Sequence, residues 1–160
     1  MLNKFLVITA VSLMSLIIVS CDRDSASEAK KVTKKKETEI VQNNSKRWYT
    51  SSQSMRGRQV FKDNCATCHG DKGQGLAEDW RKPLANDTYP APPLNGTAHT
   101  WHHSKEALLR TINNGGIPLG GTMPQFKDSL TDKQKEEVLA YVMSLWPNNI
   151  YMAWKERNPS

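Results

Sequence analysis

A short string near the middle of the chain carries the residues best suited to chemistry. Cys65 and Cys68 are separated by two residues, and His69 directly follows the second cysteine. This spacing is the attachment pattern of a c-type haem, because two thiols so placed reach two vinyl groups on one edge of a porphyrin. The adjacent histidine then lies under the iron. This haem string, residues 65–69, occurs once and predicts one haem c per chain. Cys65 and Cys68 would form the thioethers, and His69 would be an axial ligand.

Three other uses of two cysteines at this spacing remain open: a structural disulfide, a thioredoxin-like redox pair and half of a zinc site. A zinc site needs further ligands, and the only other cysteine of the chain is Cys21. A thioredoxin motif follows a strand, whereas the residues before Cys65 have the spacing of a helix. The haem interpretation needs neither a third cysteine nor a preceding strand.

The second axial ligand of the iron decides whether a haem transfers electrons or binds small molecules. Met123 lies in a loop between two glycines and a proline, distant in sequence from His69 and free to reach the opposite face of a haem. Its thioether is a soft ligand that favours ferrous iron and raises the reduction potential. We therefore expect Met123 to be the second axial ligand.

Three clustered histidines, His99, His102 and His103, compete with Met123 for this role. They come just before the expected start of a helix, where an exposed turn is the simpler interpretation. Distal ligation by one of them stays open, as does a second metal such as copper at His102 and His103.

Helical periodicity dominates the region around these candidate ligands. Small and apolar side chains recur at the spacing of a helix face at Gly57, Val60, Phe61 and Asn64, and Ser51, Ser52 or Ser54 can serve as the N-cap of this helix. Residues 104–113 have an apolar side and end at two glycines, and residues 131–146 begin with a capping box. No stretch of the sequence alternates convincingly as a strand does. The sequence therefore predicts an all-α fold, with three or more helices around one haem.

On these motifs the chain resembles the single-haem class I cytochrome c family over about residues 55–147. The resemblance rests on two residues of the first helix, the haem string, a proline loop, the methionine loop and two aromatic residues of the last helix: Gly57, Phe61, Cys65, Cys68, His69, Gly70, Pro92, Leu94, Gly96, Met123, Pro124, Tyr141 and Trp146. It implies a small cytochrome c fold in which the first and last helices cross, with Gly57 against Tyr141.

The same resemblance implies a partner for the histidine. A loop carbonyl, here that of Pro92, would hold the second ring nitrogen of His69 and so fix its tautomer and strengthen it as a ligand. A long stretch, residues 71–91, separates the haem string from this proline, and Pro90 and Pro93 are the neighbouring alternatives.

The first twenty residues have the composition of a targeting sequence. One lysine, Lys4, precedes an almost uninterrupted apolar run over residues 5–19, which is shorter than a membrane-spanning helix. Residues 18–21, Ile-Val-Ser-Cys, resemble the lipobox of bacterial lipoproteins, which implies a signal peptide over residues 1–20 and a lipid on Cys21. A plain signal peptide or a single anchor helix is the alternative.

Residues 21–47 are rich in lysine and poor in large apolar side chains, so we expect a flexible tether there. The chain as a whole carries 22 Lys and Arg against 16 Asp and Glu. Residues 48–160 carry only 13 Lys and Arg against 11 Asp and Glu, so most of the excess positive charge lies outside the expected cytochrome c domain. A nearly neutral domain on a basic tether excludes nucleic acid as a sensible partner.

Together these features predict a membrane-anchored carrier of single electrons rather than an enzyme. Its expected electron donor and acceptor are membrane redox complexes or small redox proteins. The protein itself is expected to be a monomer or a subunit of a larger complex. The lipid anchor places it in the bacterial cell envelope, with residues 48–160 facing the periplasm or the cell exterior. A haem enzyme or gas sensor with a displaceable sixth ligand, and a non-haem thiol oxidoreductase, are the alternatives. The sequence does not decide whether residues 148–160 pack on the domain.

Overall fold

The computed structural model describes residues 47–159, which belong to one compact unit. The predicted signal peptide over residues 1–20, Cys21 and the expected tether up to residue 46 lie outside the described residues. None of the helices in the described part is long and apolar enough to cross a membrane.

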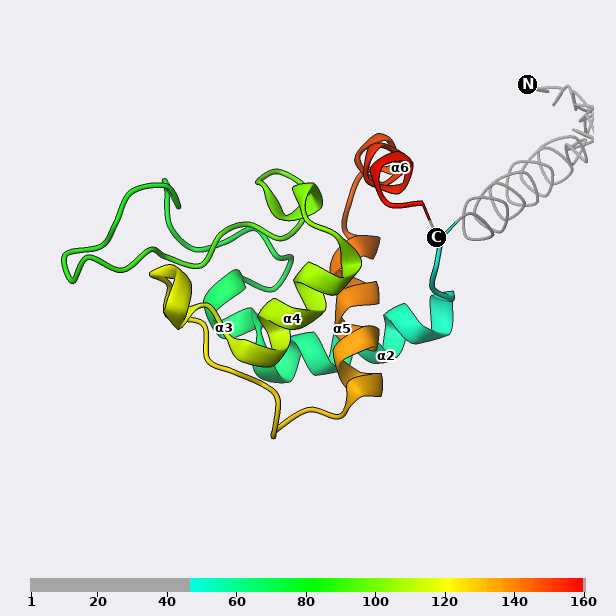
Figure 1. The fold of residues 1–160 in the computed structure, drawn as a ribbon, viewed down its shortest axis with the longest axis horizontal. Coiled ribbons are helices and arrows are strands. Elements are labelled where there is room, and N and C mark those ends of the chain that lie inside the picture. Colours follow the sequence, from blue (N-terminus) through cyan, green and yellow to red (C-terminus); the bar gives the residue numbers. More distant parts are fainter. Residues whose placement is uncertain (1–46, 160) are drawn as a thin grey trace, which may run out of the picture. The chain divides into compact units, whose positions relative to one another are not determined.

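Five α-helices and two short 3-10 helices make up the described part of the chain (Figure 1). In chain order they are α2 (Ser51–Asn64), α3 (Ala66–His69), η1 (Thr100–His102), α4 (Lys105–Asn114), η2 (Ile117–Leu119), α5 (Asp132–Ser144) and α6 (Asn148–Arg157). Residues 47–159 contain no strand, only an isolated parallel bridge between Tyr89 and Gly121. The predicted all-α class is therefore confirmed.

Local capping signals set where the two longest helices begin. Thr131 caps α5 in a capping box with Gln134, as the sequence predicts. At the start of α2 the cap is Thr50, in a second capping box with Gln53, so the prediction of a serine cap was wrong. Threonine also caps helices, and unlike the serines Thr50 has a glutamine three residues later that makes the reciprocal bond.

The helices α2 and α5 cross in close contact at Gly57. A Cβ atom at this position would collide with the Glu137 carbonyl group, so only glycine allows the two backbones to approach this closely. Tyr141, the residue expected here, lies one turn further along α5 and packs on Phe61 with 5.1 Å between the ring centroids. The helices cross where the resemblance implies, but backbone rather than an aromatic ring faces Gly57.

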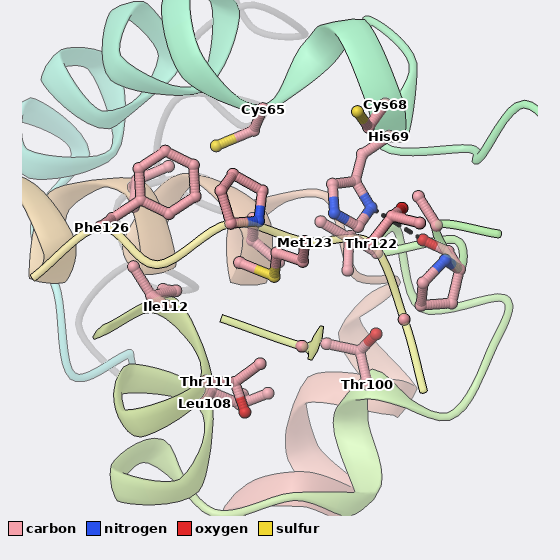
Figure 2. A pocket seen from close by; sticks show the side chains of 18 of the residues that line it. Cys65, Cys68, His69, Thr100, Leu108, Thr111, Ile112, Thr122, Met123 and Phe126 are labelled. Carbon is pink, nitrogen blue, oxygen red and sulfur yellow. Dashed lines mark hydrogen bonds between the residues drawn. The ribbon is translucent and has the colours of Figure 1, made fainter. Parts of the chain in front are cut away.

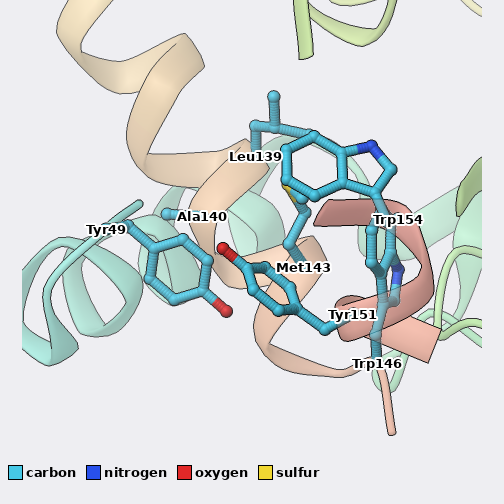
Figure 3. Packing of buried hydrophobic residues seen from close by; sticks show 7 residues of the cluster. All are labelled: Tyr49, Leu139, Ala140, Met143, Trp146, Tyr151 and Trp154. Carbon is cyan, nitrogen blue, oxygen red and sulfur yellow. The ribbon is translucent and has the colours of Figure 1, made fainter. Parts of the chain in front are cut away.

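The C-terminal residues fold back as α6 and complete an apolar cluster on α5 (Figure 3). We call this set the aromatic cluster; it consists of Tyr49, Leu139, Ala140, Met143, Trp146, Tyr151 and Trp154. No member is more than 4% exposed. The indole nitrogens of Trp146 and Trp154 donate to the carbonyls of Leu94 and His103, each at 2.8 Å. The tail that the sequence left undecided therefore packs on the domain.

Arg47, the last residue of the expected tether, contacts the same cluster. Its guanidinium donates to the Tyr49 hydroxyl at 2.7 Å and to the Met143 carbonyl at 2.9 Å. The same group lies 4.2 Å from the centroid of the Tyr151 ring. The backbone N–H of Trp48 also donates to the Tyr151 hydroxyl, at 3.0 Å. These contacts attach Arg47 to the folded body of the protein.

Candidate functional site

A mostly apolar cavity of about 420 Å³ is lined by residues of α2, α4 and α5. Most of the other walls come from the haem string and from two loops, within residues 89–94 and 116–126, and Trp80, His99, Thr100, His103 and Leu130 complete the lining. All of the predicted site residues that the structure describes line it: Cys65, Cys68, His69, Pro92 and Met123. Figure 2 shows four of them, Cys65, Cys68, His69 and Met123. A cavity of this size, largely apolar with a few polar groups, is typical of a cofactor site.

The haem string forms one turn of helix directly after α2. Cys65 is the C-cap of α2, and its carbonyl accepts bonds from the N–H groups of Cys68 at 3.1 Å and His69 at 2.9 Å. Residues three and four positions apart share one face of a helix, so the two thiols and the imidazole reach the same cavity. Gly70 then ends the turn with φ +77°, a left-handed conformation that glycine adopts without strain.

The His69 ring is buried, with 7% of the residue exposed, and its Nδ1 lies 3.0 Å from the Pro92 carbonyl oxygen. A carbonyl only accepts, so Nδ1–H donates and the lone pair of Nε2 is left available to a metal. Burial lowers the pKa of the His69 imidazole below its usual range, and the bond to Pro92 opposes part of this shift. The neutral imidazole, which is the form that binds iron, is therefore favoured.

The long stretch of residues 71–91 does not carry Pro92 away from the haem string. The Gly73 carbonyl accepts bonds from the N–H groups of Leu94 at 2.6 Å and Asn95 at 3.1 Å. These bonds hold the segment after Pro92 beside the turn that follows the haem string, while the intervening residues loop outward (Figure 1). The carbonyl beside His69 is that of Pro92 rather than of a neighbouring proline.

Met123 approaches the cavity from the loop after α4 (Figure 2). The Gly116 N–H donates to the Met123 carbonyl at 2.9 Å, and a Cβ atom at Gly115 would lie only 2.7 Å from the same carbonyl oxygen. The two glycines thus let the Met123 backbone lie against the end of α4. The His69 ring and the Met123 thioether extend into the same cavity from different segments of the chain.

One contact near Met123 has no signal in the sequence. Tyr89 pairs with Gly121 in the parallel bridge, and its N–H donates to the Gly120 carbonyl at 2.9 Å. This pair joins the loop after the haem string to the methionine loop, and Tyr89 lines the cavity. A single backbone pairing between two loops follows no periodicity or fixed spacing, so the sequence carries no signal for it.

The Cys65 thiol does not have the raised acidity of a redox-active cysteine. Both Cys65 and Cys68 are free rather than joined in a disulfide. Burial, with a smaller contribution from Cys68, raises the pKa of the Cys65 thiol to about 11. Catalytic cysteines instead have lowered pKa values, which keep the reactive thiolate populated at neutral pH. This difference disfavours the thiol oxidoreductase alternative.

The three histidines of the predicted turn lie on and beside η1, and all are exposed. His99 stacks on Trp80 with 4.7 Å between ring centroids, and His102 packs on Trp101 at 4.2 Å. His99 and His103 line the cavity. Within residues 47–159 no three His, Cys, Asp or Glu side chains are grouped so that they could hold a metal ion, so a copper site at His102 and His103 has no third ligand.

The residues around the cavity fit a haem. Two thiols, one imidazole nitrogen and one thioether are the donors that c-type haems use for attachment and axial ligation. The other lining side chains are largely apolar and suit the faces of a porphyrin. Apolar residues from α4 and α5 close the space between these donors, among them Leu108, Ile112, Val138 and Val142.

Comparison with known proteins agrees with this geometry. Residues 52–142 match the family described as cytochrome C oxidase, cbb3-type, subunit III. The cbb3-type cytochrome c oxidase subunit FixP of Sinorhizobium medicae is 36% identical over 98 residues, which cover 56% of this chain and 29% of FixP. Subunit CcoP from an Azospirillum species is 32% identical over 90 residues, covering 56% of this chain and 28% of CcoP.

A third relative comes from a different enzyme. The cytochrome c subunit of the quinone alcohol dehydrogenase of Gluconobacter oxydans is 28% identical over 104 residues, which cover 61% of this chain and 20% of that subunit. The chain thus spans less than a third of the length of each of these relatives. No solved structure matches the chain.

The family match confirms the class predicted from the sequence, a c-type cytochrome that binds haem c. It covers α2, the haem string, the cavity loops and most of α5, which are the elements that build the cavity. The chain belongs to the cytochrome c oxidase, cbb3-type, subunit III family of c-type cytochromes.

Proposed function

We propose that the chain carries one haem c, bound covalently by Cys65 and Cys68 and ligated at the iron by His69 and Met123. The observation that carries this proposal is that the two ligands, from different segments, reach the same apolar cavity as both thiols. The single haem string of the chain supports one haem per chain. When bound, the haem supplies the one-electron change between ferrous and ferric iron.

The chain's own residues hold and tune the ligands in this proposal. Pro92 orients the His69 ring and keeps its proton on Nδ1, which makes Nε2 the more basic nitrogen. The Met123 thioether favours ferrous iron and so raises the reduction potential. Because backbone bonds fix Met123 and a backbone carbonyl fixes His69, the same two ligands can serve both oxidation states with little movement.

The N-terminal region completes the proposal. Residues 1–20 act as a signal peptide, Cys21 carries the lipid, and residues 21–47 link the lipid to the domain formed by residues 48–160. Two or three acyl chains at one end make such anchoring stable, where a single chain would be reversible. The domain then faces the periplasm or the cell exterior of a bacterium.

Membrane redox complexes or small redox proteins are the partners that we propose as electron donor and acceptor. Relatives named as subunits of an oxidase and of a dehydrogenase support a role beside, or within, a larger membrane complex. Anchoring to the same membrane raises the effective concentration of such partners, so transient docking over a small area suffices for rapid turnover.

The substitution Met123→Ala tests this function at the iron. We expect the variant to keep its covalent haem, because the thiols and His69 are untouched, and to open the sixth coordination site. Absorption spectra of the ferrous protein should then shift promptly on addition of carbon monoxide, and a redox titration should show a lower potential. Met55→Ala is the matched control, because Met55 is 70% exposed on α2 and does not line the cavity.

Two outcomes would count against the proposal. A Met123→Ala variant with an unchanged potential that still excludes carbon monoxide would remove Met123 as the ligand. A wild-type ferrous spectrum that shifts promptly with carbon monoxide would instead favour the haem enzyme or gas sensor.

A further inference from the structure

Lys135 is a buried lysine that the proposed haem site does not explain. It lies in the first part of α5 and is 6% exposed. Its ammonium donates to Asn113 Oδ1 at 2.9 Å, to Asp132 Oδ1 at 3.2 Å and to the Lys127 carbonyl oxygen at 3.4 Å. An ammonium has three N–H donors, so each has an acceptor in the structure.

Stability alone does not account for this buried charge. Moving an ammonium out of water is costly, and the side chain of Asp132 is 99% exposed, so water screens its attraction. The other two acceptors are neutral oxygens, one of them on Asn113 at the C-terminal end of α4, where the helix dipole favours a cation. Replacing a buried charge by an apolar side chain of similar volume is often neutral or stabilising for a protein. We therefore look for the role of the ammonium in the segments that its hydrogen bonds join.

Those segments meet just after the methionine loop. Asn113 is in the last turn of α4, and its carbonyl accepts the N–H groups of Phe126 at 3.2 Å and Lys127 at 3.1 Å. Lys135 bonds to both sides of this junction, to the Asn113 side chain and to the Lys127 carbonyl. It thereby ties the chain after Met123 to both α4 and α5.

Met123 is held from both directions along the chain. On one side the Gly116 N–H binds its carbonyl, and on the other only Pro124, Gln125 and Phe126 separate it from Lys127. We propose that Lys135 is a positioning residue for Met123: by fixing the junction between Asn113 and Lys127 it sets how far the Met123 thioether reaches toward the haem iron. This inference rests on the proposed role of Met123 as an axial ligand.

The substitution Lys135→Met removes the ammonium and keeps a long, flexible side chain. Ferric full-length holoprotein is titrated with imidazole, which competes with the thioether for the iron. Loss of a hydrogen bond from a charged donor loosens the hold on Met123, so we expect imidazole to bind about tenfold more tightly than to the wild type. The matched control is Lys133→Met, the same change at an exposed position two residues earlier on α5.

A second measurement separates positioning from general stability. A purely structural role would lower the midpoint of denaturant unfolding and leave the imidazole affinity of the folded protein unchanged. Should Lys135→Met fail to yield holoprotein, Asn113→Ala removes one of the three acceptors and is expected to tighten imidazole binding in the same direction by less. The inference would be overturned if the variant that yields holoprotein, Lys135→Met or Asn113→Ala, bound imidazole with the affinity of the wild type. It would also be overturned if Lys133→Met changed the imidazole affinity as much as that variant does.

The variant Met123→Ala shows which proposal has failed. If it binds imidazole no more tightly than the wild type, Met123 is not the ligand and the proposed function fails with it. If Met123→Ala opens the site while Lys135→Met does not, the function stands and only the positioning role of Lys135 is lost.

Discussion

The haem cavity and the aromatic cluster share α5 but complete their packing in different ways. Val138 and Val142 line the cavity, Met143 belongs to the cluster, and Leu139 contacts both. In the cluster, side chains from α6 fill the space against α5 (Figure 3). In the cavity, the side chains instead surround an open volume of about 420 Å³. One region is thus packed by the chain alone, and the other is built for a cofactor.

The largest expected effect follows from preventing haem attachment. Without haem the largely apolar walls of this cavity, about 420 Å³ in volume, lose the group that they pack against. Unfilled cavities destabilise a protein in proportion to their volume, and a typical domain is stable by only about 5–15 kcal/mol. We expect the double variant Cys65→Ser with Cys68→Ser, freed of haem, to show no cooperative unfolding by circular dichroism. A sharp transition near that of the wild-type holoprotein would mean that the aromatic cluster alone can hold the domain.

A smaller loss of stability is expected from truncating a side chain of the aromatic cluster. Tyr151 is 1% exposed, and its hydroxyl accepts the Trp48 N–H, so Tyr151→Ala should reduce the free energy of unfolding of the holoprotein by about 3–4 kcal/mol. The absorption spectrum of the haem should stay unchanged, because Tyr151 does not line the cavity.

Denaturant titration measures the free energy of unfolding of both the wild type and Tyr151→Ala. The half-buried neighbour Ile150 supplies a matched control, and Ile150→Ala should reduce this free energy clearly less than Tyr151→Ala does. An altered haem spectrum in Tyr151→Ala would show that the two regions are not separable in this way.

The smallest expected effect is a pH dependence confined to the aromatic cluster. Burial raises the pKa of the Tyr49 hydroxyl from 10 to about 12, although Arg47 opposes the shift. The native state then keeps this proton to higher pH than the unfolded chain, so its contribution is complete below pH 10 and is lost as the pH rises toward about 12.

The variant Tyr49→Phe lacks this titration. Denaturant unfolding below pH 10 and above pH 11 should therefore show the wild type losing stability relative to Tyr49→Phe as the pH rises. A constant difference between the two proteins across this range would contradict the assignment.

Local patterns in the sequence were sufficient for much of this structure. The capping box at Thr131 and the glycines after residue 114 correctly predict where α5 begins and where α4 ends, because both depend on neighbours within four residues. The haem string predicts a shared face for Cys65, Cys68 and His69 for the same reason.

Contacts between distant segments were not predictable in this way. Periodicity shows that α5 has apolar faces, but it cannot show that Glu137 rather than Tyr141 meets Gly57. A lysine in a helix is ordinarily exposed, so nothing local marks the burial of Lys135. Its acceptors on Asn113 and Lys127 come together only once the chain has folded.

A pyridine haemochrome spectrum of the full-length protein, matured with cytochrome c assembly machinery, tests the central claim most directly. The haem content is measured after acid-acetone extraction, beside the Cys65→Ser with Cys68→Ser variant. We predict one haem per chain that stays with the wild-type polypeptide and none that stays with the variant. Wild-type protein that retains no haem, or a variant that retains as much as the wild type, would contradict the account.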